Sequence, residues 1–147
     1  MWNLKDKIVI ISGATNGIGK AAALELAKEN PKILFTYRNK DLADSLVNDM
    51  KVISPDIEVH SAFCDFSNQN SIKECVTKIS QIHNKIDVLI NNAGVVNTSY
   101  HETLEGIENT FAVNHLGYFL FTNLLIPKMR SAEETRIINV SSAAHSF

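Results

Sequence analysis

Long apolar runs and an excess of charge of either sign are both missing from this sequence of 147 residues. No apolar run approaches the roughly 20 residues that a membrane-spanning helix needs. Residues 1–6 contain no signal-peptide core, and the apolar residues 8–11 are too few for one. The formal net charge is only −2, which gives no electrostatic reason to expect binding to nucleic acid or to an anionic membrane. We therefore expect a cytoplasmic protein with a small-molecule partner.

Cysteine is scarce, and the histidines show no spacing that indicates a metal site. Cys64 and Cys75 are the only cysteines, and their separation matches no zinc motif. We expect both to be reduced thiols in the protein core. The histidines show neither H-x-x-x-H nor H-E-x-x-H spacing, so we expect no metal. They are His60, His83, His101, His115 and His145.

The rest of the composition is that of one folded domain spanning residues 1–147. Hydrophobic residues make up 45% of the chain and charged residues 20%, which is typical of a globular protein. Strand-like and helix-like segments alternate without a linker or repeat. The expected strands are residues 7–12, 32–37, 57–63, 86–90 and 136–140. The expected helices are residues 17–29, 40–53, one capped by Ser67 or Asn68, 103–111 and 112–130.

This alternation predicts an α/β fold, a Rossmann-like doubly wound parallel sheet. We expect the strand order 3-2-1-4-5, truncated after strand five, with a ligand at the carboxyl edge where the order reverses. A ligand edge should carry polar or small residues at the strand ends. The five strands are followed by Ser12-Gly13, Tyr37-Arg38, Cys64-Asp65, Asn91-Asn92 and Ser141-Ser142.

The most informative segment is the glycine-rich turn between the first strand and the first helix. Glycine lets the backbone approach a ligand closely. A helix N-terminus offers unpaired N–H groups and the positive end of its dipole to a phosphate. The spacing is G-x-x-x-G-x-G rather than the common G-x-G-x-x-G, and an ordinary glycine-rich loop is the alternative interpretation. The residues assigned here to dinucleotide binding are Gly13, Thr15, Asn16, Gly17, Ile18 and Gly19.

The residues after the second strand bear on which cofactor is bound. Proteins of this fold that bind NAD usually place an acid here, which binds the ribose 2′-hydroxyl. This chain has Arg38 and Asn39 instead, and no acid before Asp41. Because arginine pairs well with a phosphate, we expect Arg38 and Asn39 to favour NADP(H) over NAD(H). A solvated arginine without a role is the alternative, and it leaves NAD(H) open.

Four segments together resemble the N-terminal half of the short-chain dehydrogenase/reductase family, and within it the retinol dehydrogenase-like branch. They are residues 12–19, 87–94 (Asp-Val-Leu-Ile-Asn-Asn-Ala-Gly), 111–119 (Phe-Ala-Val-Asn-His-Leu-Gly-Tyr-Phe) and 136–142 (Arg-Ile-Ile-Asn-Val-Ser-Ser). The resemblance covers essentially the whole chain, although Ser12 stands where the family usually has threonine. It implies an oxidoreductase that moves a hydride between NADP(H) and an apolar alcohol or carbonyl substrate.

The resemblance also implies further cofactor-binding residues. Asp65 would bind the adenine amino group, with Phe66 beside it. The alternative for Asp65 is a helix cap. Asn92, Ala93 and Gly94 would line the cofactor ribose, where a large side chain would occupy the cofactor's place. Asn91, by contrast, would tie the fourth strand to its neighbours.

The catalytic residues that the resemblance implies are present only in part. Ser142, with Ser141 as the alternative, matches a serine that binds the substrate oxygen, and Asn114 matches an asparagine whose backbone carbonyl holds a relay water. The general acid/base of the family is the tyrosine of a Tyr-x-x-x-Lys motif, and no tyrosine here is followed by lysine four residues later. We therefore expect an incomplete chain without useful dehydrogenase activity of its own. The alternatives are a non-catalytic dinucleotide-binding module and a homodimer that pairs through the 112–130 helix.

Overall fold

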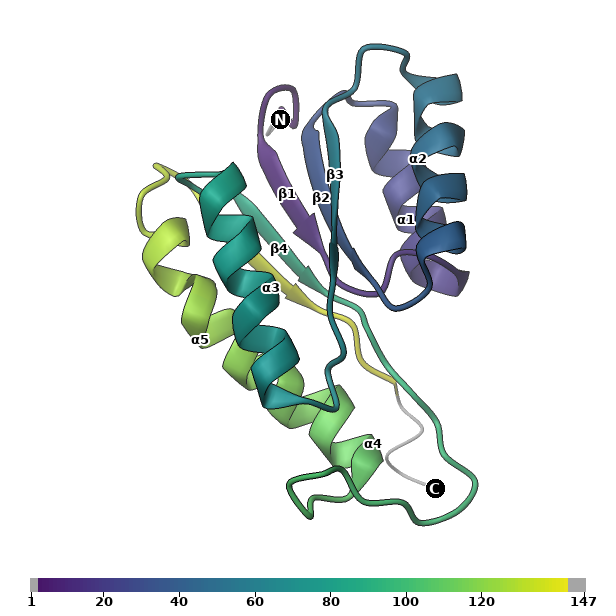
Figure 1. Cartoon of the computed structure of the whole chain (residues 1–147). Coiled ribbons are helices and arrows are strands. Elements are labelled where there is room, and N and C mark those ends of the chain that lie inside the picture. Colours follow the sequence, from purple (N-terminus) through teal and green to yellow (C-terminus); the bar gives the residue numbers. More distant parts are fainter. Residues whose placement is uncertain (1–2, 143–147) are drawn as a thin grey trace.

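A five-stranded parallel sheet forms the centre of the protein (Figure 1). The computed structural model describes residues 3–142, so the ends of the expected 1–147 domain lie outside the described residues. The strands pair in the order β3-β2-β1-β4-β5, which confirms the expected Rossmann-like topology. Their bounds are β1 (Ile8–Ile11), β2 (Lys32–Tyr37), β3 (Val59–Phe63), β4 (Val88–Asn91) and β5 (Arg136–Asn139).

Helices cover both faces of this sheet, as Figure 1 shows. The helical segments are α1 (Gly17–Ala27), α2 (Lys40–Ile53), α3 (Gln69–Ile82), the short α4 (Asn109–Phe111), the π-helical segment η1 (Ala112–Leu116) and α5 (Gly117–Met129). One face packs against α1 and α2, and the other against α3 and α5. Within residues 3–142, no helix is both long and apolar enough to cross a membrane.

The alternation of side chains along β1 builds a separate core on each face of the sheet. Ile8 and Ile10 lie in the apolar cluster beneath α3 and α5, whereas Val9 and Ile11 lie in the cluster beneath α1 and α2. All four side chains are buried, and each contributes about 1.5–3 kcal/mol on the usual scale for burying an aliphatic side chain. β1 is thereby apolar on both faces, as is usual for a central strand of a parallel sheet.

A buried ion pair fixes the amino ends of β1 and β4. The Asp87 carboxylate is only 1% exposed; it accepts a hydrogen bond from the Ile8 backbone N–H at 2.8 Å and pairs with Lys7 Nζ at 3.4 Å. A buried carboxylate is tolerated only with such partners. Asp87 therefore belongs to the scaffold, at the end of the strands opposite the glycine-rich turn.

The predicted helix at residues 103–111 is wrong, because a tight turn replaces most of it. The Thr103 N–H donates to the Ile107 carbonyl at 2.8 Å, and Gly106 between them has a φ of +72°. Glu102 and Glu108 then pair as an antiparallel bridge. The Thr103 hydroxyl accepts the Ile107 N–H at 3.4 Å, so side-chain bonding favours the turn over a helix. Only α4 remains helical, and the Glu108 carboxylate caps it.

Other expected boundaries shift by one or two residues, with two informative cases. The expected strand 57–63 begins at Val59, since the Ile57 N–H is bound in a turn to the Ser54 carbonyl at 3.1 Å. The expected 112–130 helix begins as the wider η1 turn and continues as α5. Of the two alternatives for the α3 cap, the structure selects Asn68, whose side chain accepts the Ser71 N–H at 3.0 Å.

Candidate functional site

A hollow of about 450 Å³ lies at the carboxyl ends of the strands. Every residue expected to bind the cofactor lines it: Gly13, Thr15, Asn16, Gly17, Ile18, Gly19, Arg38, Asn39, Asp65, Phe66, Asn92, Ala93 and Gly94. Five further wall residues were not expected from the sequence, namely Thr36, Leu42, Val95, Val113 and Val140, and two more, Tyr37 and Cys64, were named only as strand-end residues. Apolar and small wall residues carry no distinguishing pattern, although each of these lies close in sequence to an expected site residue or strand end.

The glycines of the turn are required by close packing against the Asn-Ala-Gly segment after β4. Gly13 has a φ of +65°, and a Cβ built on it would lie 2.7 Å from Ala93 Cα. A Cβ on Gly19 would collide with the Gly13 carbonyl oxygen and with Asn92 Nδ2. Asn92 Nδ2 also donates to the Gly13 carbonyl at 2.9 Å, and Thr36 Oγ1 accepts the Gly13 N–H at 3.2 Å. The two segments thus form one rigid wall of the hollow.

Helix α1 begins at this wall without a side-chain cap. Its N-cap residue Asn16 makes no capping hydrogen bond, and its first turn holds no acidic side chain. Helices α2 and α3 differ, because Asn39 and Asn68 each accept a first-turn N–H. The unpaired N–H groups of α1, together with its dipole, favour an anion such as a phosphate in the hollow.

Arg38 and Asn39 stand at the rim of the hollow, after β2. Arg38 is exposed, and no acidic side chain within residues 3–142 pairs with its guanidinium. Asn39 has a second role that the sequence analysis did not assign, since its side chain accepts the Leu42 N–H at 3.1 Å and caps α2. The guanidinium is therefore available to an anionic ligand, and the backbone that presents it is held by that cap.

Asp65 also lies at the rim of the hollow, after β3, the strand next to β2. Its Oδ1 accepts hydrogen bonds from the Ser67 N–H at 2.9 Å and the Ser67 hydroxyl at 2.7 Å. Asp65 therefore does not cap α3, which removes the alternative that the sequence left open. Phe66 also packs edge-on against Phe121 with ring centroids 5.2 Å apart, so it anchors the rim to α5.

Asn91 ties β4 to its neighbours, as expected. Its Nδ2 donates to Asn139 Oδ1 at 2.8 Å and to Thr122 Oγ1 at 2.9 Å, so it links β4 to β5 and to α5.

The side chain of Asn114 makes two hydrogen bonds to the backbone of Val95. Its Oδ1 accepts the Val95 N–H and its Nδ2 donates to the Val95 carbonyl, both at 2.9 Å. Asn114, which lies in the π-helical segment η1, thereby holds the irregular segment that follows β4. Such π-turns are frequent at functional sites.

The two serines at the end of β5 occupy different surroundings. Ser141 lines a second hollow together with Asn114 and Tyr118. Ser142 is exposed and lines neither hollow. The structure therefore brings Ser141, the alternative, beside Asn114, while the role of either serine remains a prediction.

Tyr118 is the tyrosine that belongs to this second hollow. Its hydroxyl donates a hydrogen bond to the Ala93 carbonyl, and burial raises its pKa to about 12. A phenol that is bound and protonated in this way positions Ala93; it does not offer a base near neutral pH.

The comparisons with known proteins now identify the family. The family described as short chain dehydrogenase matches residues 7–146. The chain belongs to the short-chain dehydrogenase family. This short-chain dehydrogenase is 40% identical to retinol dehydrogenase 13 of Homo sapiens over 97% of the chain and 43% of the relative. It is 33% identical to polyprenol dehydrogenase of Homo sapiens over 95% of the chain and 44% of the relative.

A solved structure supports the same assignment. A metagenomic short-chain oxidoreductase in complex with NADP superposes with a TM-score of 0.82 at 27% identity, over 99% of this chain and 66% of that one. The expected similarity to retinol dehydrogenases is thus confirmed. The chain spans less than half the length of the curated relatives named above.

The cysteines of this short-chain dehydrogenase match the expectation, and the structure also brings together one group of potential metal ligands. Cys64 and Cys75 are free and buried, and the hydrogen bond between them together with burial raises the pKa of the Cys64 thiol. The structure gathers Glu58, His60 and His83, which the sequence analysis did not connect. The i, i+2 spacing of Glu58 and His60 on a strand was a usable signal, whereas His83 comes from a distant helix end. His145 lies outside the described residues.

Proposed function

We propose that this chain is the dinucleotide-binding part of an NADP(H)-dependent short-chain dehydrogenase that interconverts an alcohol and a carbonyl compound. The observation that carries the proposal is the convergence of all the expected cofactor residues on one hollow beside the uncapped end of α1. The α1 N–H groups would bind the pyrophosphate, and Arg38 would pair with the 2′-phosphate. The similar solved oxidoreductase that contains NADP supports this choice of cofactor.

When bound, the nicotinamide would supply the hydride chemistry, and the chain's own residues would position it. Asn92, Ala93 and Gly94 would present backbone to the ribose, and Asp65 would use its carboxylate to bind the adenine amino group. Asn114 and one of the two serines would orient the substrate oxygen and its proton. Each of these roles follows from the family resemblance and is supported by the positions described above.

The proposed substrate is an apolar alcohol or the corresponding carbonyl compound. Two relatives are named for retinol and for a polyprenol, which are both apolar alcohols. The second hollow has a mixed lining that supports this choice, with Phe119 and Ile137 among apolar residues and Asn114 and Ser141 among polar ones.

A non-catalytic binding module is the second candidate for the 147 residues taken alone. The observation that favours it is the engagement of Tyr118, whose hydroxyl is bound to Ala93 and whose pKa is raised to about 12 by burial. Tyr37 and Tyr100 are also not followed by lysine four residues later. We therefore propose that this chain binds the dinucleotide and that turnover needs a base from outside these residues.

The experiment is a binding titration followed by a turnover assay on the 147-residue protein. We expect NADPH to bind tighter than NADH by at least about tenfold, a factor that corresponds to about 1.4 kcal/mol. Retinal and short aldehydes should give no product with bound NADPH. Failure to bind either nucleotide would refute the proposal, and product formation would refute the non-catalytic form of it.

Two further expectations remain predictions. Helix α5 buries Phe121, Leu125 and Met129 in the core, while Phe119 and Leu124 on its other side are exposed. Pairing of two chains through that exposed side would make a homodimer, and light scattering would measure its mass. The cytoplasmic location is a proposal that rests on the expected reduced thiols.

A further inference from the structure

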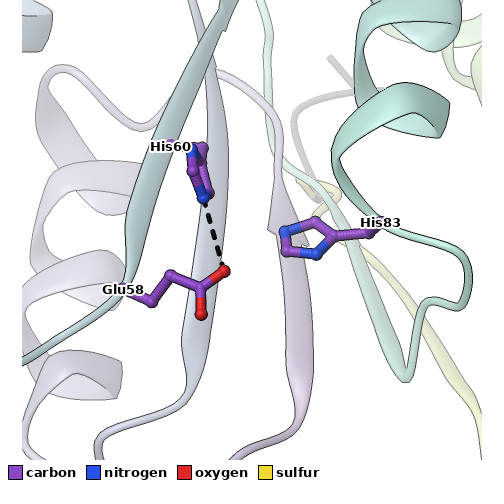
Figure 2. Close-up of side chains that lie close together, drawn as sticks. All are labelled: Glu58, His60 and His83. Carbon is purple, nitrogen blue, oxygen red and sulfur yellow. Dashed lines mark hydrogen bonds and ion pairs between the residues drawn. The ribbon is translucent and has the colours of Figure 1, made fainter.

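Glu58, His60 and His83 gather at the end of the sheet opposite the dinucleotide hollow (Figure 2). Side chains alternate along a strand, so His60 emerges from β3 on the same face as Ala62, the face covered by α3, and Glu58 directly precedes the strand. His83 closes the C-terminus of α3, where its backbone N–H donates to the Ile79 carbonyl at 3.0 Å. The potential ligand atoms of the three residues all lie within 4.8 Å of one another.

His83 is the unusual member, because a ring nitrogen of this buried residue has no hydrogen-bond partner. The residue is only 6% exposed, and its Nε2 has no hydrogen-bond partner. Figure 2 shows its ring pointing toward Glu58 and His60, and its centroid lies 5.7 Å from that of His60. A buried polar atom left unpaired costs free energy, so a ligand bound to Nε2 would be stabilising. Burial also lowers the pKa of His83, which keeps the imidazole neutral and its lone pair available.

We propose that Glu58, His60 and His83 bind a zinc ion. Two imidazoles and one carboxylate form a recurrent zinc ligand set, with a water in the fourth position. At zinc–ligand bonds of about 2.0–2.1 Å, two ligands of a tetrahedral site lie about 3.4 Å apart. His60 Nε2 and Glu58 Oε1 are already 3.3 Å apart. Because all the ligand atoms lie within 4.8 Å of one another, no separation has to shorten by more than about 1.4 Å, which rotation of the partly exposed Glu58 and His60 side chains accommodates.

Lys32 limits the affinity of this site but does not block it. Its Nζ lies 2.8 Å from Glu58 Oε2, which leaves Oε1 directed at His60. The hydrogen bond from Lys32 also holds the pKa of Glu58 below its ordinary value, so the carboxylate is ionised at neutral pH. The ammonium, however, repels a divalent cation. Removing that charge while keeping the ligands should therefore tighten zinc binding.

A metal at this position would tie an edge strand of the sheet to the end of a helix. Among residues 3–142, β3 pairs with β2 alone, and the Ile33 N–H donates to the Glu58 carbonyl at 2.9 Å. The zinc would join the start of β3 to the C-terminus of α3, and β3 then runs to Asp65 at the rim of the hollow. The proposal does not depend on the proposed function, since the two sites lie at opposite ends of the strands.

The test is a calorimetric titration of the 147-residue protein with Zn²⁺, paired with the visible spectrum of its Co²⁺ form. We expect one Zn²⁺ per chain and the absorption of four-coordinate Co²⁺ bound to nitrogen and oxygen. His60→Ala and Glu58→Gln should each weaken binding at least about tenfold, and His83→Gln should do the same. His101→Ala and His115→Ala, at exposed positions elsewhere, should leave the affinity unchanged. Lys32→Gln should increase it.

Several outcomes would overturn the proposal. The first is the absence of zinc binding to folded protein. The second is binding that survives both His60→Ala and Glu58→Gln, which change exposed or half-buried residues and should not prevent folding. A thiolate charge-transfer band in the Co²⁺ spectrum would place the metal on the buried cysteines instead. An unchanged or weaker affinity in Lys32→Gln would contradict the role given to its charge.

Discussion

Ser12 and Asn92 bind each other's backbone. The Ser12 hydroxyl accepts the Asn92 N–H at 2.9 Å, and Asn92 Nδ2 donates to the Ser12 carbonyl at 3.0 Å. The same hydroxyl accepts the Ala93 N–H at 3.0 Å. Because Ser12 follows β1 and Asn92 follows β4, the pair joins the two strands between which the sheet order reverses. The candidate cofactor hollow opens at this junction.

Ser12→Ala should destabilise the protein by about 1–3 kcal/mol, because two backbone N–H groups lose their acceptor in a buried place. A urea unfolding curve measures this change. Ser12→Thr keeps the hydroxyl that the family usually has and serves as the matched control. Equal urea midpoints for the alanine variant and the original protein would show that the hydrogen bonds to the Ser12 hydroxyl contribute nothing to stability.

Gly13→Ala should lower stability by about 2–4 kcal/mol and abolish dinucleotide binding. The positive φ disfavours any side chain, and the added Cβ would lie 2.7 Å from Ala93 Cα. Gly106→Ala is the control, since Gly106 has a φ of +72° but no atom lies within 4 Å of its Cβ position. That variant should lose only about 1 kcal/mol. Similar losses in both would mean that the contact with Ala93 is unimportant.

Arg38→Gln should weaken NADPH binding by about 10- to 100-fold and leave NADH binding nearly unchanged. The expected loss is that of one charge-assisted contact to the 2′-phosphate, about 1.5–3 kcal/mol. Fluorescence titration with both nucleotides measures it. Arg130→Gln, at an exposed position beyond α5, is the charge-matched control. An equal loss of affinity for NADPH and NADH would instead indicate that Arg38 acts in folding or attracts the phosphates of both nucleotides.

Tyr118→Phe should change how stability depends on alkaline pH. Tyr118 keeps its proton in the folded protein up to about pH 12, whereas an unfolded tyrosine releases it near pH 10. Its contribution to stability is therefore complete below pH 10 and is lost as the pH rises from 10 to 12. The original protein should lose about 1–2 kcal/mol more than Tyr118→Phe over this interval, since part of the ring is exposed. Urea unfolding curves of both proteins at three pH values between 10 and 12 measure this difference. An identical pH dependence of the free energy of unfolding in the two proteins would contradict the raised pKa.

The strand order and the cofactor wall could be predicted from the sequence because their signals are local. Each local pattern indicates the structure of its own residues. These patterns are the apolar run before Gly13, the Asn-Ala-Gly segment ending at Gly94 and the polar residues at the strand ends. The turn around Gly106 was not foreseen, because the apolar spacing of residues 103–111 fits a helix equally well. The π-turn that contains Asn114 was also not predicted, since no residue type is specific to such a turn.

The candidate zinc site shows a second limit of structure prediction from the sequence. His83 meets Glu58 only after α3 has crossed back over the sheet, and no periodicity within a helix or strand connects positions that far apart. Likewise, the residues that pair with Asn91 come from α5 and β5. Contacts between distant segments depend on tertiary packing, so they became visible only in the folded chain.

Because α1 begins without a cap, a phosphate bound there would complete the helix as Asn39 completes α2. The free protein should then open first at the start of α1, and hydrogen exchange of its first-turn amides should slow when the nucleotide binds. At a nucleotide concentration 100 times the Kd, the bound form would gain about 2.7 kcal/mol of stability. The resistance of this protein to unfolding and degradation would consequently rise and fall with the supply of its own cofactor.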